Sequence, residues 1–304
     1  MQLIPDDIDW SAYARDTEAR VKVKPASAFA DGLLAEFAVR DESGVRPVMT
    51  STKLNRIEFR PGELTAWAGY NGHRKSMFTG QVALDFCRAG IRTMVASFEM
   101  SPERSLARMA RQAFGVAYPS GDQLRRLNAW SDGRLWMFDH LGRIDPSLCI
   151  AVCRYFATEL KGQQVFIDSM MMVCSSEESM DEQKQYVTDL VRMAQETGLH
   201  VHLITHCRKP QHGEDKWPTK YDLRGSAAIS DQAHNVITVW SNRDKLAKLQ
   251  ENPHDSGALS EPDARVSVEK QRNGDFEGAV RLWWHAPSMR FCDDRMSPVK
   301  AYEL

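Results

Sequence analysis

One segment, residues 69–76, constrains the fold of this chain more than any other. It reads Gly69-Tyr70-Asn71-Gly72-His73-Arg74-Lys75-Ser76, which matches the pattern G-x-x-x-x-G-K-[ST] except at Arg74. Residues 63–68 before it form an apolar run suited to a buried strand, and residues 77–87 after it have helical character. A strand that turns sharply into a helix aims backbone N–H groups and the positive end of the helix dipole at one point. The eight residues are therefore predicted to cradle the phosphates of a nucleotide.

Two side chains of this loop have specific expected roles. Lys75 would reach the β- and γ-phosphates, and the Ser76 hydroxyl would bind Mg²⁺. Arg74 occupies the position of a glycine, so its Cβ costs roughly 1 kcal/mol if the backbone there needs a positive φ. Its guanidinium could instead add a contact to phosphate. Taken alone, the motif could also be a chance glycine-rich turn before a helix.

Length and composition predict a globular protein with one large domain or two small ones. The chain has 304 residues, of which 42% are hydrophobic and 26% charged. No apolar run approaches the ~20 residues of a membrane span, and an N-terminus with Asp6, Asp7 and Asp9 does not resemble a signal peptide. Six cysteines without a framework spacing predict reduced thiols and an intracellular protein. A net charge of −2 restricts any contact with nucleic acid to a local basic surface.

Residues 1–56 and 57–304 are predicted to differ in organisation. The first part would be a helical linker segment. Ser27 opens an expected helix with an apolar stripe formed by Phe29, Leu33, Leu34 and Phe37. Either its own domain or a neighbouring subunit would cover that stripe.

From Ile57 onward, short apolar runs alternate with helical segments, which predicts an α/β fold with a mostly parallel sheet flanked by helices. Strands are expected at residues 63–68, 92–98, 135–138, 164–168, 199–205, 235–240, 265–269 and 278–284. Helices are expected at residues 77–87, from Ser101-Pro102, from Asp145-Pro146 to about residue 160, and at 181–197. Residues 245–263 are polar and are predicted to be a mobile insertion.

Several residues at strand ends are candidates for a site. Asp168 closes an apolar strand and would hold Mg²⁺ opposite the Ser76 hydroxyl, commonly through water. His206 follows another strand at its carboxyl end, where sheets of this kind place ligand residues. His200 and His202 alternate along that strand, and a half-buried strand face explains them more simply than a metal site.

Three further features have competing interpretations. Cys149 and Cys153 lie four residues apart, and core packing is favoured over zinc binding. Trp283 and Trp284 are expected to pack rather than to stack on bases. The polar loop 207–224 is either solvated or contacts a phosphate backbone, and its position at the ligand-binding edge favours contact. Its basic residues are Arg208, Lys209, Lys216, Lys220 and Arg224.

Six segments together resemble the ATPase domain of the hexameric replicative helicases, a group that includes bacterial DnaB proteins, phage primase–helicases and mitochondrial Twinkle. They are RPGEL (60–64), SFEMS (97–101), VFIDS (165–169), THCRK (205–209), DLRGSAAI (222–229) and EKQRNG (269–274). They occur in the order of the family and span roughly residues 57–285. The resemblance implies a RecA-like fold that uses ATP and Mg²⁺.

The resemblance also implies residue roles. Glu99 would be the general base that polarises the attacking water, and His206 would sense the γ-phosphate. Lys270 and Arg272 would reach into the ATP site of the neighbouring subunit, with Arg243 as a second candidate for that arginine finger. The segment 222–229, including Gly225, would lie on single-stranded DNA, and the helix near residues 29–37 would dock on the adjacent protomer.

The function that the resemblance implies is an ATP-dependent DNA helicase that translocates on single-stranded DNA as a hexameric ring. The 5′-to-3′ direction follows from the resemblance alone. Primase or other replisome proteins are candidate partners, no membrane contact is expected, and the expected location is the cytoplasm of a bacterial or phage-infected cell. One alternative is a DNA-stimulated RecA-like ATPase, or a recombination or loading factor, that does not unwind duplex. Another is a non-catalytic nucleotide-binding scaffold.

Overall fold

The computed structural model describes residues 25–30, 49–174, 179–208, 216–225, 227–296 and 298–304. The chain divides into two units, Met1–Ser43 and Gly44–Leu304. In the first unit the described residues form a short 3-10 helix, η1 (Ala26–Phe29). Leu33, Leu34 and Phe37 lie outside the described residues, so the apolar linker helix stays a prediction. The domain boundary at residue 57 also stays a prediction, although Met49 and Leu54 are buried in the core of the second unit.

The second unit is built on a sheet of nine strands in its described part, in the order β3-β2-β4-β5-β1-β6-β7-β8-β9. The strands from β3 to β6 run parallel, and β7, β8 and β9 continue the sheet in antiparallel pairs. Their bounds are β1 Leu64–Ala68, β2 Thr93–Ser97, β3 Leu135–Met137, β4 Gln164–Asp168, β5 His200–Ile204, β6 Asn235–Ser241, β7 Ala264–Gln271, β8 Gly278–His285 and β9 Arg290–Cys292. The predicted mostly parallel sheet is confirmed.

The helices are α3 Lys75–Arg88, α4 Pro102–Phe114, α5 Gly121–Ser131, α6 Pro146–Thr158, α7 Met180–Thr197, α8 Ala228–Gln232, α9 Arg243–Glu251 and α10 Ser256–Ser260. The predicted starts of α4 and α6 are confirmed. The Ser101 side chain accepts a hydrogen bond from the Arg104 N–H, and Asp145 accepts from the N–H groups of Ser147 and Leu148. Among the described residues, no helix has the length and apolarity to cross a bilayer.

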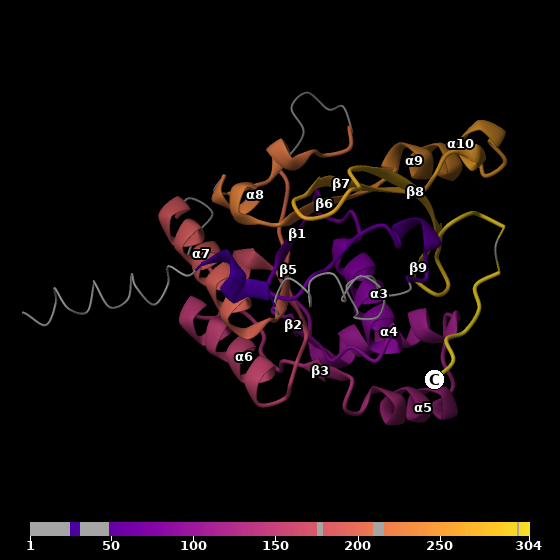
Figure 1. The fold of residues 1–304 in the computed structure, drawn as a ribbon. Coiled ribbons are helices and arrows are strands. Elements are labelled where there is room, and N and C mark those ends of the chain that lie inside the picture. Colours follow the sequence, from indigo (N-terminus) through magenta and orange to yellow (C-terminus); the bar gives the residue numbers. More distant parts are fainter. Residues whose placement is uncertain (1–24, 31–48, 175–178, 209–215, 226, 297) are drawn as a thin grey trace, which may run out of the picture. The chain divides into compact units, whose positions relative to one another are not determined.

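Alternate residues of the central strands enter two cores on opposite faces of the sheet. In β2, Met94 and Ala96 face one core and Val95 the other; in β4, Phe166 joins Val95. Helices α6, α7 and α8 cover the first face, and α3 and α4 cover the second (Figure 1). Strands covered on both faces read as continuous apolar runs, which is why the sequence revealed them.

The predicted half-buried face of β5 is wrong, because both faces of that strand are covered and both histidines are fully buried. His200 bonds Thr65 Oγ1 at 2.9 Å and the Arg60 carbonyl at 2.6 Å. His202 accepts from the Trp67 indole N–H at 3.0 Å and lies 2.9 Å from Gln164 Oε1. Burial lowers the pKa of His200 to about 3 and that of His202 well below its usual value, so both rings are neutral. Every ring nitrogen already has a protein partner, which leaves none for a metal.

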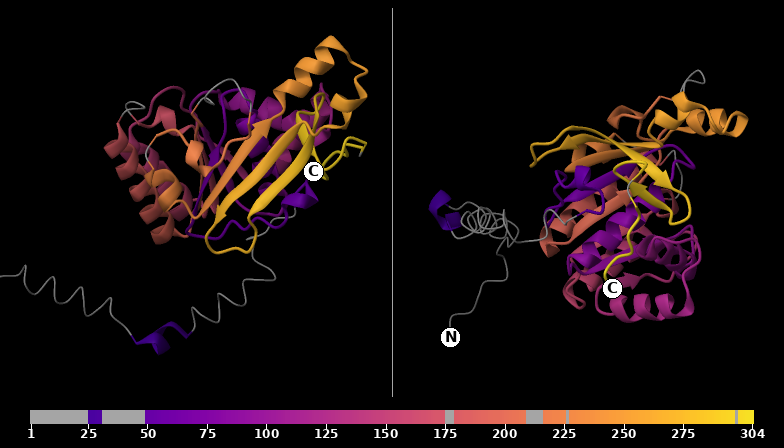
Figure 2. Two further views of the ribbon diagram at one scale, coloured as in Figure 1. Left: turned by 90° about the horizontal axis from the view of Figure 1, so that it is seen from above. Right: turned by 90° about the vertical axis from the view of Figure 1, so that its right-hand side faces the viewer.

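The predicted mobile insertion at residues 245–263 is also wrong, because the segment forms α9 and α10. The Asn242 and Asp255 side chains cap these two helices. The buried Lys245 ammonium lies 2.7 Å from Asp263 Oδ1 and donates to the Glu261 carbonyl at 2.6 Å. Figure 2 shows the orange helices α9 and α10 beyond the ends of the long strands β7 and β8. Capping and a buried ion pair thus fix a segment whose composition is polar.

Cys149 and Cys153 are buried in the core, as predicted.

Candidate functional site

The carboxyl edge of the parallel sheet gathers the predicted nucleotide-site residues other than Lys270 and Arg272. The glycine-rich loop follows β1, Glu99 follows β2, Asp168 ends β4 and His206 follows β5. Because β2 and β4 pair in parallel with Ser97 opposite Asp168, their ends lie side by side. Four segments that are distant in sequence therefore meet at one place.

Lys75 links the loop to the end of β5. Its ammonium donates to the carbonyls of Gly69 at 2.8 Å and Tyr70 at 3.0 Å, and it lies 3.1 Å from His206 Nδ1. The side chain is buried, and burial lowers the pKa of Lys75. As the first residue of α3, Lys75 stands where the helix N-terminus is most positive.

The loop backbone needs glycine at two positions. A Cβ on Gly69 would collide with the Val239 carbonyl oxygen, and a Cβ on Gly72 would collide with the Arg243 guanidinium. Gly72 also has a φ of +76°, which side chains rarely adopt. The His73 N–H closes this turn on the Tyr70 carbonyl at 3.3 Å, and a tight turn that leads into a helix N-terminus suits a nucleotide phosphate chain.

Arg74 has the strained backbone that its position implied, with a φ of 61° and a ψ of 26°. Its guanidinium lies over the Trp284 ring, 4.4 Å from the centroid, and Trp284 packs against Phe291 at 4.9 Å. Nη1 of Arg74 is buried and has no hydrogen-bond partner among the described residues. The arginine that replaces glycine is therefore held by an aromatic ring of β8.

His73 anchors the loop to β6, a role that the sequence analysis did not assign. Its Nδ1 accepts from the Ser241 N–H at 3.1 Å, and its carbonyl accepts from the Ser241 hydroxyl at 3.2 Å. Burial, followed by the charges of Arg243, Lys75 and Arg74, lowers the pKa of His73 to about 4. A neutral His73 can accept this backbone hydrogen bond.

Glu99 is oriented by two neighbours. Its side chain is about half exposed, with 48% accessible. The Ser169 hydroxyl donates to Glu99 Oε1 at 2.6 Å, and His206 Nε2 lies 3.9 Å from the same oxygen. The contact with His206, then the hydrogen bond from Ser169, lowers the pKa of Glu99 to about 2 although partial burial opposes this. The carboxylate is ionised at any physiological pH.

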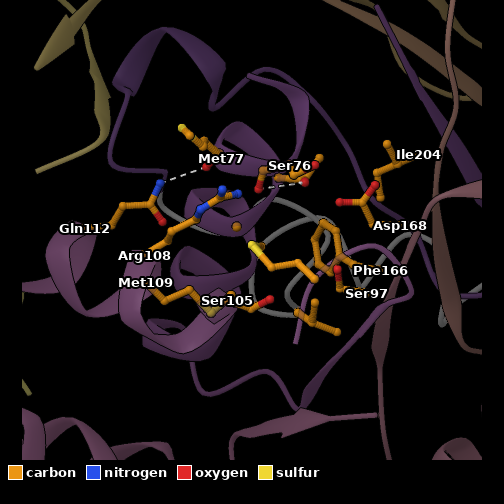
Figure 3. A pocket seen from close by; sticks show the side chains of 14 residues that line it. Ser76, Met77, Ser97, Ser105, Arg108, Met109, Gln112, Phe166, Asp168 and Ile204 are labelled. Carbon is orange, nitrogen blue, oxygen red and sulfur yellow. Dashed lines mark hydrogen bonds between the residues drawn. The ribbon is translucent and has the colours of Figure 1, made fainter. Parts of the chain in front are cut away.

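Asp168 and Ser76 supply oxygen atoms suited to a hard cation. Burial raises the pKa of Asp168, whereas its hydrogen bond with Ser76 and the charge of Lys75 act in the opposite direction. Both residues line a cavity of about 30 Å³ that Arg108 and Gln112 reach from α4 (Figure 3). The hydroxyls of Ser97 and Ser105 also line it and have no hydrogen-bond partner in the described part of the chain. Apolar side chains make up most of the remaining lining, so the fit to Mg²⁺ rests on the Asp168 carboxylate and the Ser76 hydroxyl.

The predicted DNA-binding loop is joined to this site at both of its ends. Cys207 pairs with Leu223 as an antiparallel bridge. The Arg208 N–H donates to the Asp222 carbonyl, and the Arg224 N–H donates to the His206 carbonyl, both at 2.8 Å. Arg208 and Lys216 are exposed, Lys220, Arg224 and Gly225 are partly buried, and Lys209 lies outside the described residues.

Lys270 and Arg272 lie at the opposite edge of the sheet from the glycine-rich loop. β7 runs antiparallel to β6 with Gln271 opposite Asn235, whereas the loop meets β6 at Ser241. From Asn235 to Ser241 an extended strand spans about 20 Å. Lys270 donates to the carbonyls of Ser230 and Asp231, and Arg272 donates to that of Asp231 at 2.9 Å. The structure therefore does not bring these two cations into the site of their own chain.

Arg243, the other candidate for an arginine finger, does lie in that site. Its guanidinium donates to the Asn71 carbonyl at 2.8 Å. The sequence analysis missed this contact, and it missed Ser169 as the partner of Glu99. Ser169 directly follows Asp168 at the strand end, so its position was a usable signal.

Comparison with known proteins gives a matching family model and a phage relative. The model of the DnaB-like helicase C terminal domain matches residues 50–293. A DNA helicase/primase of Enterobacteria phage T3 is 25% identical over 246 residues, which cover 70% of this chain and 43% of that protein. The chain thus spans less than half the length of this relative.

Two solved structures show the same fold. One is an ATPase domain that superposes with a TM-score of 0.73 at 17% identity, covering 90% of this chain and all of the other. A DnaB-like replicative helicase, solved in a study of its interactions with primase, gives a TM-score of 0.69 at 17% identity, covering 93% of this chain and 71% of the other. The RecA-like architecture predicted from sequence is confirmed.

Proposed function

Because the chain belongs to the DnaB-like helicase C-terminal domain family, a family of P-loop NTPases, we propose that it is a ring-forming replicative helicase motor. Six copies would surround single-stranded DNA and move along it 5′ to 3′, with ATP hydrolysed between subunits. The printed names of the phage relative and of the solved helicase also favour primase as a partner.

The observation that carries this proposal is the separation between Arg272 and the loop of its own chain. β6 alone places about 20 Å between the two edges of the sheet. A cation at the amino edge can assist hydrolysis only in another subunit, and in a closed ring every amino edge can face a neighbour's carboxyl edge.

Each residue of the carboxyl edge has a proposed role. The loop N–H groups and Lys75 bind the phosphates, and Ser76 and Asp168 hold the cation. Bound Mg²⁺ would neutralise charge that develops on the departing phosphoryl group. Glu99 accepts a hydrogen bond from the attacking water and aligns it. A carboxylate with so low a pKa orients and polarises water more than it removes a proton.

His206 would couple the site to DNA. It lies 3.1 Å from the Lys75 ammonium through Nδ1, and its carbonyl accepts the Arg224 N–H at 2.8 Å. A shift of His206 with nucleotide state is thus passed to the basic loop by a backbone hydrogen bond. Arg208, Lys209, Lys216, Lys220, Arg224 and Gly225 are the proposed DNA contacts.

The test is a mixing experiment with two inactive variants. Arg272→Ala should lower turnover by about 10³ to 10⁵ while ATP binding persists. Glu99→Gln damages the site on its own subunit, and Arg272→Ala damages the site next door. Mixtures should therefore recover part of the ATPase activity at mixed interfaces, and that activity should vanish on dilution.

Arg243→Ala provides the matched control, because Arg243 contacts its own loop. A mixture of Glu99→Gln with Arg243→Ala should recover nothing beyond the residual activity of Arg243→Ala. Persistent inactivity of the Arg272→Ala mixture, with subunit exchange shown independently, would contradict the proposal. Strand displacement on forked DNA then separates a helicase from an ATPase that does not unwind.

A further inference from the structure

Tyr221 presents an uncovered aromatic ring in the middle of the basic segment 216–225. It is 82% exposed, one of the most exposed large hydrophobic side chains in the described part of the protein. Exposing so large a ring has no role in folding, since the ring buries almost nothing. A singly exposed ring is common on protein surfaces, so the case for a binding contact rests on the place of Tyr221 between the cations Lys220 and Arg224.

The backbone that carries this ring is fixed. The Thr219 side chain accepts from the Tyr221 N–H at 3.4 Å, and Asp222 Oδ2 accepts from the Thr219 N–H at 2.7 Å and from its hydroxyl at 2.8 Å. The Thr238 hydroxyl on β6 donates to the Pro218 carbonyl at 3.0 Å. A ring held on an ordered turn requires little further ordering when it binds a ligand.

Trp217, in the same segment, has an aromatic ring that contacts other side chains of the protein. Its ring is covered by the Arg265 guanidinium at 4.1 Å and meets Trp240 edge-on at 6.5 Å. The Lys220 ammonium lies 5.6 Å from the Tyr221 centroid, within cation–π range, and the side chain still stays 82% exposed. Trp217 is 47% exposed and partly packed against the protein, whereas Tyr221 is 82% exposed beside a cation.

We propose that Tyr221 stacks on a base of single-stranded DNA while Lys220 and Arg224 contact the flanking phosphates. This inference rests on the proposed function and adds to it a stacking contact with the face of a base. Stacking on an aromatic ring accepts any base and strengthens binding by about five- to hundredfold per base. It therefore suits a motor that must hold every sequence equally.

The position of Tyr221 also couples it to the nucleotide site. The neighbouring Asp222 carbonyl accepts the Arg208 N–H at 2.8 Å, two residues beyond His206. A displacement of His206 is thus passed to the Tyr221 ring through two backbone hydrogen bonds. In one the Arg224 N–H donates to the His206 carbonyl, and in the other the Arg208 N–H donates to the Asp222 carbonyl. The stacked base would move with the loop.

The test compares two oligonucleotides with equal numbers of phosphates, oligo(dT) and an abasic strand of the same length, bound to the full chain with a non-hydrolysable ATP analogue. The wild-type chain should prefer oligo(dT) by about five- to hundredfold. Tyr221→Ala should lose that preference, and Tyr221→Phe should keep it. The matched control is Tyr118→Ala, because Tyr118 is 93% exposed on the turn between α4 and α5. This substitution should leave the preference for oligo(dT) unchanged.

The cations give an independent readout. Replacing Lys220 and Arg224 with alanine should flatten the salt dependence by up to about 0.7 for each phosphate that is no longer neutralised, with the base preference retained. A base preference that survives Tyr221→Ala would overturn the inference. So would a change in oligomer size with unchanged base preference, which would assign Tyr221 to an interface between copies. Wild-type chain that binds neither oligonucleotide would overturn the proposed function itself.

Discussion

The two edges of the central sheet differ in the charged side chains that they gather. At the carboxyl edge, Lys75, Glu99, Asp168 and His206 lie close together, so charges of both signs balance locally. At the amino edge, the ammonium of Lys270 and the guanidinium of Arg272 donate to backbone carbonyls at the end of α8. One edge gathers charges of both signs, and the other presents a pair of cations.

The pKa shifts at the amino edge also differ from those at the carboxyl edge. Burial lowers the pKa of Lys270, and the charge of Arg272 lowers it further, while Asp231 opposes both only in part. Burial also lowers the pKa of His234, with Arg272 and Lys270 adding to the effect. Two cations placed side by side favour an anionic partner. Hydrolysis in this family member is therefore expected to depend on two chains, each contributing one edge.

The largest expected effect within the carboxyl edge is that of Glu99→Gln. Removing the carboxylate should lower turnover by about 10² to 10⁴, because positioning and polarising the water is lost. Nucleotide affinity should stay near the wild-type value, since the loop and Lys75 are untouched. Single-turnover ATPase assays and equilibrium nucleotide binding measure the two quantities.

Glu103→Gln is the matched control for this variant. Glu103 lies in the first turn of α4, four residues from Glu99, and its side chain is exposed. Its replacement should leave turnover within about twofold, as for most exposed positions. Equal losses in both variants would mean that general charge, rather than the geometry of Glu99, governs the rate. The carboxyl edge would then not be a site distinct from its surroundings.

Much of the carboxyl edge could be predicted from sequence because its signals are local. Apolar runs that end at Asp168 and His206 identify strands with a polar residue at the carboxyl end, and parallel strands bring such ends together. The glycine-rich loop needed only its eight residues and their flanks. The fold class followed from the alternation of strands and helices.

The features that were missed depend on contacts between distant segments. No local pattern shows that β7 turns antiparallel to β6, and that reversal is what separates Arg272 from its own loop. Helix α9 was mistaken for an insertion because its polar composition conceals the burial of Lys245 against Asp263. The stacking of Arg74 on Trp284 joins two segments far apart in the sequence that only the folded sheet brings together.

A smaller effect is expected from His206→Gln, through the pH dependence of turnover. The pKa of Glu99 is lowered from 4.5 to about 2, and His206 is the main cause. The wild-type carboxylate therefore stays ionised above about pH 4, and Glu99 should give no acidic limb there. Without His206 its pKa should rise toward 4.5, so protonation should remove up to about half of the Glu99-dependent rate at pH 4.5.

The measurement is a pH–rate profile of single turnovers for both proteins, each normalised to its own rate at pH 8. The acidic fall in the rate of His206→Gln is due to Glu99 if it disappears in the double variant that also carries Glu99→Gln. Profiles that coincide for wild type and His206→Gln would show that His206 does not hold Glu99 ionised. The hydrogen bond from Ser169 and the charge of Lys75 would then have to keep the pKa of Glu99 low.

The smallest expected effect is on stability, and it compares the arginines of the two edges. Arg272 is bound by backbone oxygens, whereas Arg74 already has the Trp284 ring as its partner at 4.4 Å. Arg74→Gly relieves a positive φ worth roughly 1 kcal/mol, but it removes a cation–π interaction worth about 0.5–2 kcal/mol. The free energy of unfolding should therefore change by less than about 1 kcal/mol in either direction.

Trp284→Leu removes the same interaction without relieving the backbone, so it should destabilise the protein more than Arg74→Gly does. In a double-mutant cycle followed by denaturant unfolding, the pair should show a coupling of about 0.5–2 kcal/mol. Trp283 contacts Lys53 instead of Arg74. Arg74→Gly with Trp283→Leu should therefore be additive within about 0.5 kcal/mol. Equal coupling in both cycles would mean that Trp284 does not hold Arg74 specifically. The strained backbone at Arg74 would then lack its compensating partner, and Arg74 would be as available to an anion as Arg272.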